Sequence, residues 1–277
     1  MTANGHIKLR SALLLAAVLP GAAACSVKED RAECPVYVTV LTDRFVQRGL
    51  NEGTLSFASE QPIRREDVNF LSLLDRGFTQ PCPREYARAS VISGLENGTL
   101  SEETLTVGPG LQADLIWAYA ETFSVHADAY RIDAEPHKQY CLVKFTFDGS
   151  STAPPDYPWR FRIKAECAGM NLYTLEPVTG FYSAPVGPNA MGEWYGVLPR
   201  QRSNNMQLEI FLPEQGSSTA GRTDYIVDLG RAFEEKGYDW TLEDLKDIEV
   251  QVGFVNTTVR VTVSDWDSEG GNWHVEI

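Results

Sequence analysis

Apolar and polar residues alternate along most of the chain after residue 35, which is the pattern of strands that bury one face. The first such run is Val36–Val40, a β-branched stretch that follows Pro35. Later runs with the same period read YCLVKFTF, WRFRIKAEC, MQLEIFLP and TVRVTVSDW. Residues 68–74 form another apolar run, closed by the turn signal Asp75-Arg76-Gly77. This pattern predicts an all-β chain of antiparallel sandwiches.

Helix signals are few. Residues 231–236 predict one short helical turn that ends before Gly237. Thr241 and Asp244 have the spacing of a capping box, which predicts another turn over 241–245. A few short helical turns are therefore expected among the strands.

The strand series breaks near Ala134-Glu135-Pro136 and starts again at Tyr140. This break predicts two tandem sandwiches, one over residues 35–135 and one over 136–277. The alternative break is the proline-rich stretch 151–158, which is read instead as an exposed hairpin loop.

The N-terminal 24 residues have the layout of a secretory signal. Lys8 and Arg10 precede an apolar segment of 13 residues, Ala12–Ala24, which is too short to span a bilayer. The small residues before Cys25 resemble a lipoprotein signal, in which cleavage between Ala24 and Cys25 leaves an acylated cysteine as the first mature residue. The alternative is an ordinary signal peptide cut near Ala24, with Cys25 left as a free thiol.

Residues 25–34 would then be a lipidated tether, carrying acyl chains such as palmitate on Cys25. Lys28-Glu29-Asp30 resembles the signal that sends lipoproteins of Bacteroidota to the cell surface. We therefore expect a protein anchored by lipid to the outer membrane and exposed on the outside.

The net charge of −14 for the full chain becomes two units more negative once Lys8 and Arg10 are removed. Such a surface repels nucleic acid and anionic lipid headgroups, so neither is an expected partner. Attachment to a membrane must then come from the lipid chains.

Four cysteines remain in the mature chain, and in an exported protein they suggest two disulfides. Pairing within each predicted domain would join Cys34 to Cys82 and Cys141 to Cys167. The other reading is buried free thiols. The chain has no CxxC motif and the mature part holds only three scattered histidines, so we expect no metal and no cofactor.

Several short motifs resemble the FimB-type fimbrial anchor family of Bacteroidota along essentially the whole chain. They are Glu33-Cys34-Pro35 before the first strand, NFLSLLDRG at 69–77, YCLVKFTF at 140–147 and VRVTVSDW before the last strand. The resemblance implies two transthyretin-like sandwiches and a place at the base of a pilus. The compact first domain and Cys82 depart from the family pattern.

Three other motifs have simpler structural readings. Residues 265–276 match some positions of a calcium-binding EF-hand loop, but strand-like residues flank them, so we expect an acidic hairpin turn. GPGLQA at 108–113 imitates a dinucleotide fingerprint without a helix after it, so we expect a β-turn. The acidic pairs Glu102-Glu103 and Glu234-Glu235 are read as solvated surface, and no catalytic motif occurs.

The predicted function is a non-enzymatic surface lipoprotein that anchors or terminates a fimbria by β-strand complementation with a pilus subunit. Arg44 and Arg48 lie after the first strand, where the family's shaft pilins would be trimmed, and in an anchor they should stay uncut. A tip or shaft pilin is an alternative of the same class. A surface glycan-binding lipoprotein is the other alternative, suggested by tryptophans 117, 159, 194, 240, 266 and 273.

Overall fold

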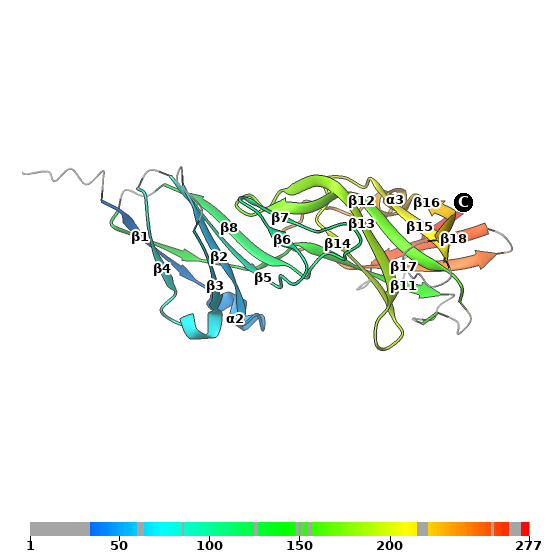
Figure 1. The fold of residues 1–277 in the computed structure, drawn as a ribbon, viewed down its shortest axis with the longest axis horizontal. Coiled ribbons are helices and arrows are strands. Elements are labelled where there is room, and N and C mark those ends of the chain that lie inside the picture. The colour runs from blue at the N-terminus through cyan, green and yellow to red at the C-terminus, as the bar shows by residue number, and fades with distance from the viewer. Residues whose placement is uncertain are drawn as a thin grey trace, which may run out of the picture.

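The fold is an all-β sandwich architecture with two units in a row (Figure 1). The structure, a computed structural model, describes residues 34–59, 64–84, 86–124, 127–147, 150, 152–153, 157–214, 221–255, 258–265 and 273–276. Its described helices are α2 (Asp43–Gln47), α3 (Leu229–Glu235) and the 3-10 helix η1 (Phe70–Leu73). Within the described residues no helix has both the length and the apolar character needed to cross a bilayer.

Two sheets form the first unit. One has the order β4 (Phe78–Cys82), β1 (Val36–Leu41), β9 (Ala129–Asp133). The other has the order β10 (His137–Lys138), β8 (Trp117–Phe123), β5 (Ala87–Ser93), β2 (Glu52–Ala58), β3 (Arg64–Asn69). Alternate residues of β1 and β5 point into a shared core with Phe45, Phe70 and Phe123, as period-2 patterning requires.

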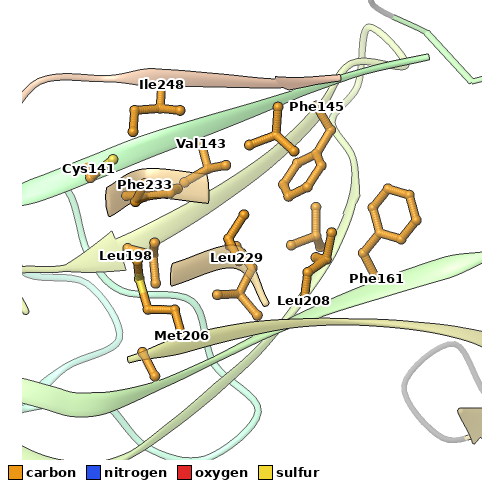
Figure 2. Close-up of a cluster of buried hydrophobic side chains, with 14 of the residues drawn as sticks. Cys141, Val143, Phe145, Phe161, Leu198, Met206, Leu208, Leu229, Phe233 and Ile248 are labelled. Atoms are coloured by element: carbon orange, nitrogen blue, oxygen red, sulfur yellow. The ribbon is translucent and has the colours of Figure 1, made fainter. Parts of the chain in front are cut away.

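The second unit is a longer sheet that folds over on itself. Its order is β16 (Gly221–Val227), β15 (Met206–Pro213), β12 (Arg160–Asn171), β13 (Pro177–Pro188), β14 (Trp194–Pro199), β11 (Tyr140–Phe147), β17 (Ile248–Val255), β18 (Thr258–Asp265), β19 (Trp273–Glu276). Figure 2 shows its core, where Val143, Phe145 and Phe161 lie near Leu208 and Phe233. Helix α3 contributes Leu229 and Phe233, both fully buried.

The predicted antiparallel pairing holds for most strand pairs, with two parallel exceptions. β1 pairs with β9 in parallel, and β11 pairs with β17 in parallel. Hydrophobic alternation reports which face of a strand is buried and carries no information on the direction of its neighbour. The direction therefore had to come from the structure.

Strands cross the predicted boundary near residue 135. The short hairpin of β6 (Thr99–Leu100) and β7 (Thr104–Thr106) lies in the first predicted domain, yet β7 pairs with β12 of the second unit. Conversely, β10 lies in the second predicted domain and pairs with β8 of the first unit. An apolar cluster that includes Ile92, Leu105 and Leu172 also draws on both units. The two units are therefore joined by shared strands and a shared core.

Two local predictions need correction. The apolar run 68–74 is divided, because β3 ends at Asn69 and η1 follows it. The capping-box turn over 241–245 is not helical. Asp239 accepts the amide of Thr241 at 2.8 Å, while Asp244 accepts the amide of Lys138 at 2.7 Å, so the predicted capping residue is used in a long-range contact.

Candidate functional site

Strand β1 fills the centre of its sheet. Val36, Val38 and Val40 are fully buried, and β1 is bonded on one side to β4 and on the other to β9. Each buried valine contributes roughly 1.5–3 kcal/mol relative to an exposed one. Removing the strand would leave an apolar groove between β4 and β9 with unpaired backbone groups on both walls.

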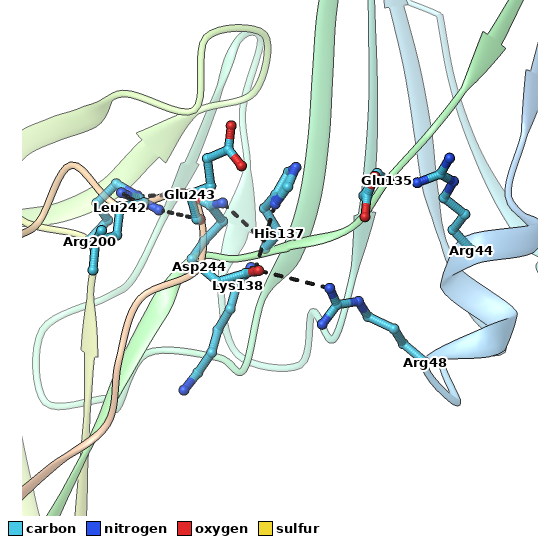
Figure 3. A network of polar contacts seen from close by, with 10 residues as sticks. Arg44, Arg48, Glu135, His137, Lys138, Arg200, Leu242, Glu243 and Asp244 are labelled. Carbon is cyan, nitrogen blue, oxygen red and sulfur yellow. Dashed lines mark hydrogen bonds and ion pairs between the residues drawn. The ribbon is translucent and has the colours of Figure 1, made fainter. Parts of the chain in front are cut away.

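Arg44, one of the two predicted trimming positions, lies in α2 immediately after β1. Its guanidinium forms an ion pair with Glu135 and lies 3.4 Å from an oxygen of Asp133 (Figure 3). Both acidic residues lie at the end of β9 or just after it. The helix is thus tied to the strand that flanks β1.

Arg48, the other predicted trimming position, is the C-terminal capping residue of α2. Its Nη2 lies 3.8 Å from Oδ2 of Asp244 in the second unit. Its guanidinium also stacks over the ring of Trp117, 4.8 Å from the ring centre. Proteases cut extended, exposed chain far faster than a packed helix. Arg44 lies within the short helix α2 and Arg48 caps it, so neither arginine lies in extended chain.

Asp244 joins the two units. Besides Arg48, its carboxylate accepts the amide of Lys138 at 2.7 Å and lies 3.8 Å from Nδ1 of His137. Lys138 in turn donates from Nζ to Asp247 at 2.5 Å. These contacts connect β10, which belongs to the five-stranded sheet of the first unit, to the loop before β17.

Arg200 holds the same loop from the other side. Arg200 is 9% exposed. Its guanidinium donates to Gln139 Oε1 at 2.9 Å, to the carbonyls of Trp240 and Leu242 at 2.5 and 2.7 Å, and to the Glu243 carbonyl at 2.9 Å. Desolvation lowers the pKa of Arg200 from its ordinary value. Sequence reasoning missed this residue, because its partners are carbonyl groups that no side-chain pattern marks.

A second polar contact lies at the edge of the shared core. Arg88 on β5 donates two hydrogen bonds to the carboxylate of Glu103, at 2.5 and 3.1 Å. Its guanidinium also stacks on Tyr173, 4.6 Å from the ring centre, at the turn after β12. The hydrogen bond from Arg88 lowers the pKa of the Glu103 carboxyl. Glu103, which the sequence predicted to be solvated surface together with Glu102, is therefore hydrogen-bonded to Arg88.

A cleft of about 540 Å³ opens where the two units meet. Tyr119 and Ala120 of β8 line one wall. The opposite wall includes Leu175, Pro177 and Leu242 of the second unit.

The four cysteines of the described chain are free, so the two candidate disulfides are not formed in this structure. Cys34 is exposed and lies beyond the strand pair in which Cys82 opposes Val36. Cys141 on β11 and Cys167 on β12 are separated in the sheet order by β13 and β14. Burial raises the pKa of Cys82 to about 11 and that of Cys141 to about 12.

Several predicted positions lie outside the described residues. These are the cleavage site at Ala24 and Cys25, the tract Lys28-Glu29-Asp30, and most of the acidic stretch 265–276. The structure contains no group of three or more His, Cys, Asp or Glu side chains suited to a metal ion within its described part.

The remaining motifs are mostly structural. The 108–113 motif forms a turn in which Gly110 has a φ of 81°, as glycine allows, and no helix follows before β8. Trp194 and Trp240 are buried in the core of the second unit. Trp159 is half-buried against that core, and Trp117 is half-buried against the core of the first unit. The four tryptophans whose side chains are described thus pack inside the molecule rather than forming an open aromatic platform.

The two-unit all-β sandwich is a fold that solved structures from Bacteroidota share. The fold is similar to a candidate adhesin from Bacteroides ovatus, with a TM-score of 0.59, 9% identity, and coverage of 88% of this chain and 96% of the other. It is similar to the fimbrial anchor protein Mfa2 from Porphyromonas gingivalis, with a TM-score of 0.57, 10% identity, and coverage of 84% and 98%.

A third similar structure, from Bacteroides thetaiotaomicron, is described as a candidate polysaccharide-binding protein. Its TM-score is 0.50 at 10% identity, with coverage of 85% of this chain and 99% of the other. No protein-family model matches the chain, and a search of curated proteins finds no match. The chain therefore has the fold of these adhesin and anchor proteins of Bacteroidota, whose function is not transferred by fold alone.

Proposed function

We propose that this protein is a non-enzymatic surface lipoprotein that anchors or terminates a fimbria on the outer membrane. The observation that carries the proposal is the place of the first strand, paired on both sides in its own sheet. β1 lies in the middle of its sheet, Arg44 lies in the short helix that follows, and Arg48 caps that helix. A subunit that keeps this strand also keeps its connection to the lipid-bearing N-terminus.

The arrangement of the two units supports an anchor geometrically. β1 lies at one end of the elongated molecule and the C-terminal strands lie at the other (Figure 1). Lipid chains on Cys25 would hold the β1 end at the membrane, and the second unit would then point away from it. Several chains on one cysteine attach a protein durably, whereas a single chain does so only marginally.

The partner in this proposal is a fimbrial subunit that exchanges a β-strand with the protein. Main-chain hydrogen bonds give such a contact its affinity, and pockets for alternate side chains give it specificity. The protein has no catalytic role in this assembly, and its work is attachment.

The test replaces the lipidated cysteine in the native bacterium. Cys25→Ala should prevent acylation, so fimbriae are shed into the medium instead of staying on the cells. Cys34→Ala is the matched control, because Cys34 is exposed and unpaired but lies beyond the acylation site. Quantitative blots of cell-bound and released fimbriae measure the effect. Fimbriae that stay attached in the Cys25→Ala strain would contradict the anchoring role.

A further inference from the structure

Most sheet edges in this protein carry features that keep another strand from pairing with them. Natural proteins protect edges with charges, prolines, bulges or covering segments. β3 presents a charged run, Arg64–Asp67, and Arg65 reaches from it to the carbonyl of Ser101 at 2.8 Å. β4 contains Pro81, which cannot donate a backbone hydrogen bond.

Three further long edges with described side chains, those of β13, β9 and β16, are protected as well. The outer side of β13 pairs with β14 only at Gly187 and Pro188, but the strand contains Pro177 and Pro185, and its Ser183 carbonyl accepts the amide of Gly110 at 2.9 Å. β9 carries exposed Arg131 and Asp133, and Asp133 contacts Arg44. β16 is paired to β15 with a register shift between Ile210 and Phe211, and it carries charged residues at 222 and 224. Bulges and charges both oppose regular pairing with an added strand.

β8 differs from these edges. On its outer side it pairs with β10 only at Trp117 and Ala118, and no described strand continues that pairing from Tyr119 to Phe123. On its inner side it pairs with β5 in regular antiparallel register along its full length. The open part of β8 has no proline and no bulge.

The open part of β8 carries one carboxylate, and it is held by hydrogen bonds. Glu121 is its one ionisable acid, and the carboxylate accepts hydrogen bonds from the hydroxyls of Tyr119 and Tyr130, both at 2.7 Å. Ala120 and Thr122 alternate with these residues along the strand, and Thr122 is exposed. The open part of β8 therefore has a single charged side chain, Glu121, beside backbone groups that no described strand pairs with.

The chain leaves this edge open because it crosses between sheets. Ala134, which precedes β10, donates its amide to the carbonyl of Leu41 at 3.1 Å and so belongs to the β1 sheet. Pro136 then precedes the two residues of β10. Among the described strands, this crossing leaves none beside the rest of β8.

The junction cleft begins where this open edge begins. Tyr119 and Ala120 line it, and Leu175, Pro177 and Leu242 form apolar parts of the facing wall. An extended segment laid along β8 would make main-chain hydrogen bonds with the strand and could place an apolar side chain in the cleft.

We infer that the edge of β8 from Tyr119 to Phe123 is the docking edge for an extended segment of a fimbrial subunit, with the junction cleft receiving its side chains. This inference rests on the proposed function, because it identifies where the partner of that function binds. It differs from exchange at β1, since β1 keeps both its neighbours.

The test compares two Thr→Lys variants of the full mature chain in capture of purified, sheared fimbriae. Thr122→Lys places a charge on the open edge, a device that blocks strand pairing, and capture should fall about tenfold. Thr223→Lys is the matched control, because Thr223 is also exposed and lies on the β16 edge. It should capture fimbriae as the unaltered protein does. Equal melting temperatures for the three proteins would show that each is folded.

Hydrogen exchange gives a second readout without a substitution. Amides of residues 120–123 should exchange more slowly when fimbriae are bound, while those of β3 and β16 should not change. Equal capture by all three proteins, or slowed exchange only at another edge, would overturn the docking edge while the proposed function stands. If the unaltered protein captures no fimbriae, the proposed function fails and this inference fails with it.

Discussion

The side chain of Gln201 forms hydrogen bonds with the backbone of β12 where the strand pairing is irregular. β12 shifts register against β13 on both sides of Cys167, which opposes Thr179, and the pairing of β12 with β15 ends at Ala165. Gln201 is 1% exposed, accepts the Cys167 amide at 2.9 Å and donates to the carbonyls of Cys167 and Pro199 at 3.0 and 2.8 Å. One side chain therefore satisfies three buried backbone groups.

Replacing Gln201 with leucine should destabilise the protein strongly. Each buried polar group left without a partner costs about 1–3 kcal/mol, so we expect a loss of about 3 kcal/mol or more in the free energy of unfolding. Urea denaturation measures it. Gln207→Leu, at an exposed position on β15, is the control and should change stability little. A similar midpoint for both variants would contradict this role.

The cysteines can be tested by their reactivity. Cys34 is exposed, whereas Cys82, Cys141 and Cys167 are buried and their thiols have raised pKa values. In folded Cys25→Ala protein at pH 8 we expect a maleimide to label Cys34 alone, because burial limits both access and thiolate formation. After unfolding without reductant, mass spectrometry should find all four labelled. Two or four unlabelled thiols would instead support the disulfides that the sequence suggested.

At the scale of elements, the contact between Arg88 and Glu103 ties β5 to the loop before β7. Because the hydrogen bond from Arg88 lowers the pKa of Glu103 in the folded state, its stabilising effect is complete above the ordinary pKa of 4.5. The effect is lost as the pH falls through the lowered value. Glu103 is 41% exposed in its side chain, so the contribution stays modest, at about 0.5–1 kcal/mol.

Glu103→Gln should therefore lower the unfolding free energy at pH 7 and lose that difference as the pH falls below about 4.5. Urea unfolding at a series of pH values measures it. Glu102→Gln makes the same charge change at the adjacent exposed position, where the structure shows only a backbone contact with Arg65. A constant difference between Glu103→Gln and the unaltered protein at every pH would show that ionisation of Glu103 is not the cause.

The sequence predicts elements far better than it predicts their partners. Alternation located strands such as β11 and β12, because burial of one face imposes a period of two whatever the neighbour is. It could not give the parallel pairing of β1 with β9, nor the crossing of the domain boundary by β7. The contacts of Asp244 and Arg200 depend on residues more than 30 positions away, so local spacing mistook Asp244 for a helix cap.

At the scale of the whole molecule, the two units form one elongated body. β7 pairs with β12 across the junction, Arg48 contacts Asp244, and the apolar cluster around Leu105 is shared. A pull on the second unit would therefore be transmitted to the first through strands, ion pairs and packed side chains together. This continuity suits a protein proposed to connect a fimbria to a membrane.

β1 lies at the N-terminal end of this elongated body (Figure 1). If burial of β1 protects the arginines that follow, Val38→Asp should make the folded protein sensitive to trypsin at Arg44 and Arg48, because a buried charge without a partner loosens the strand. Val38 is fully buried, whereas Tyr37 is 55% exposed, so Tyr37→Asp is the matched control and should remain resistant. On cells, mass spectrometry should find residues 25–48 continuous with the rest of the chain. A surface protein that starts at Phe45 or Gly49 would show that the strand is removed in life, and the chain would then be a shaft pilin rather than an anchor.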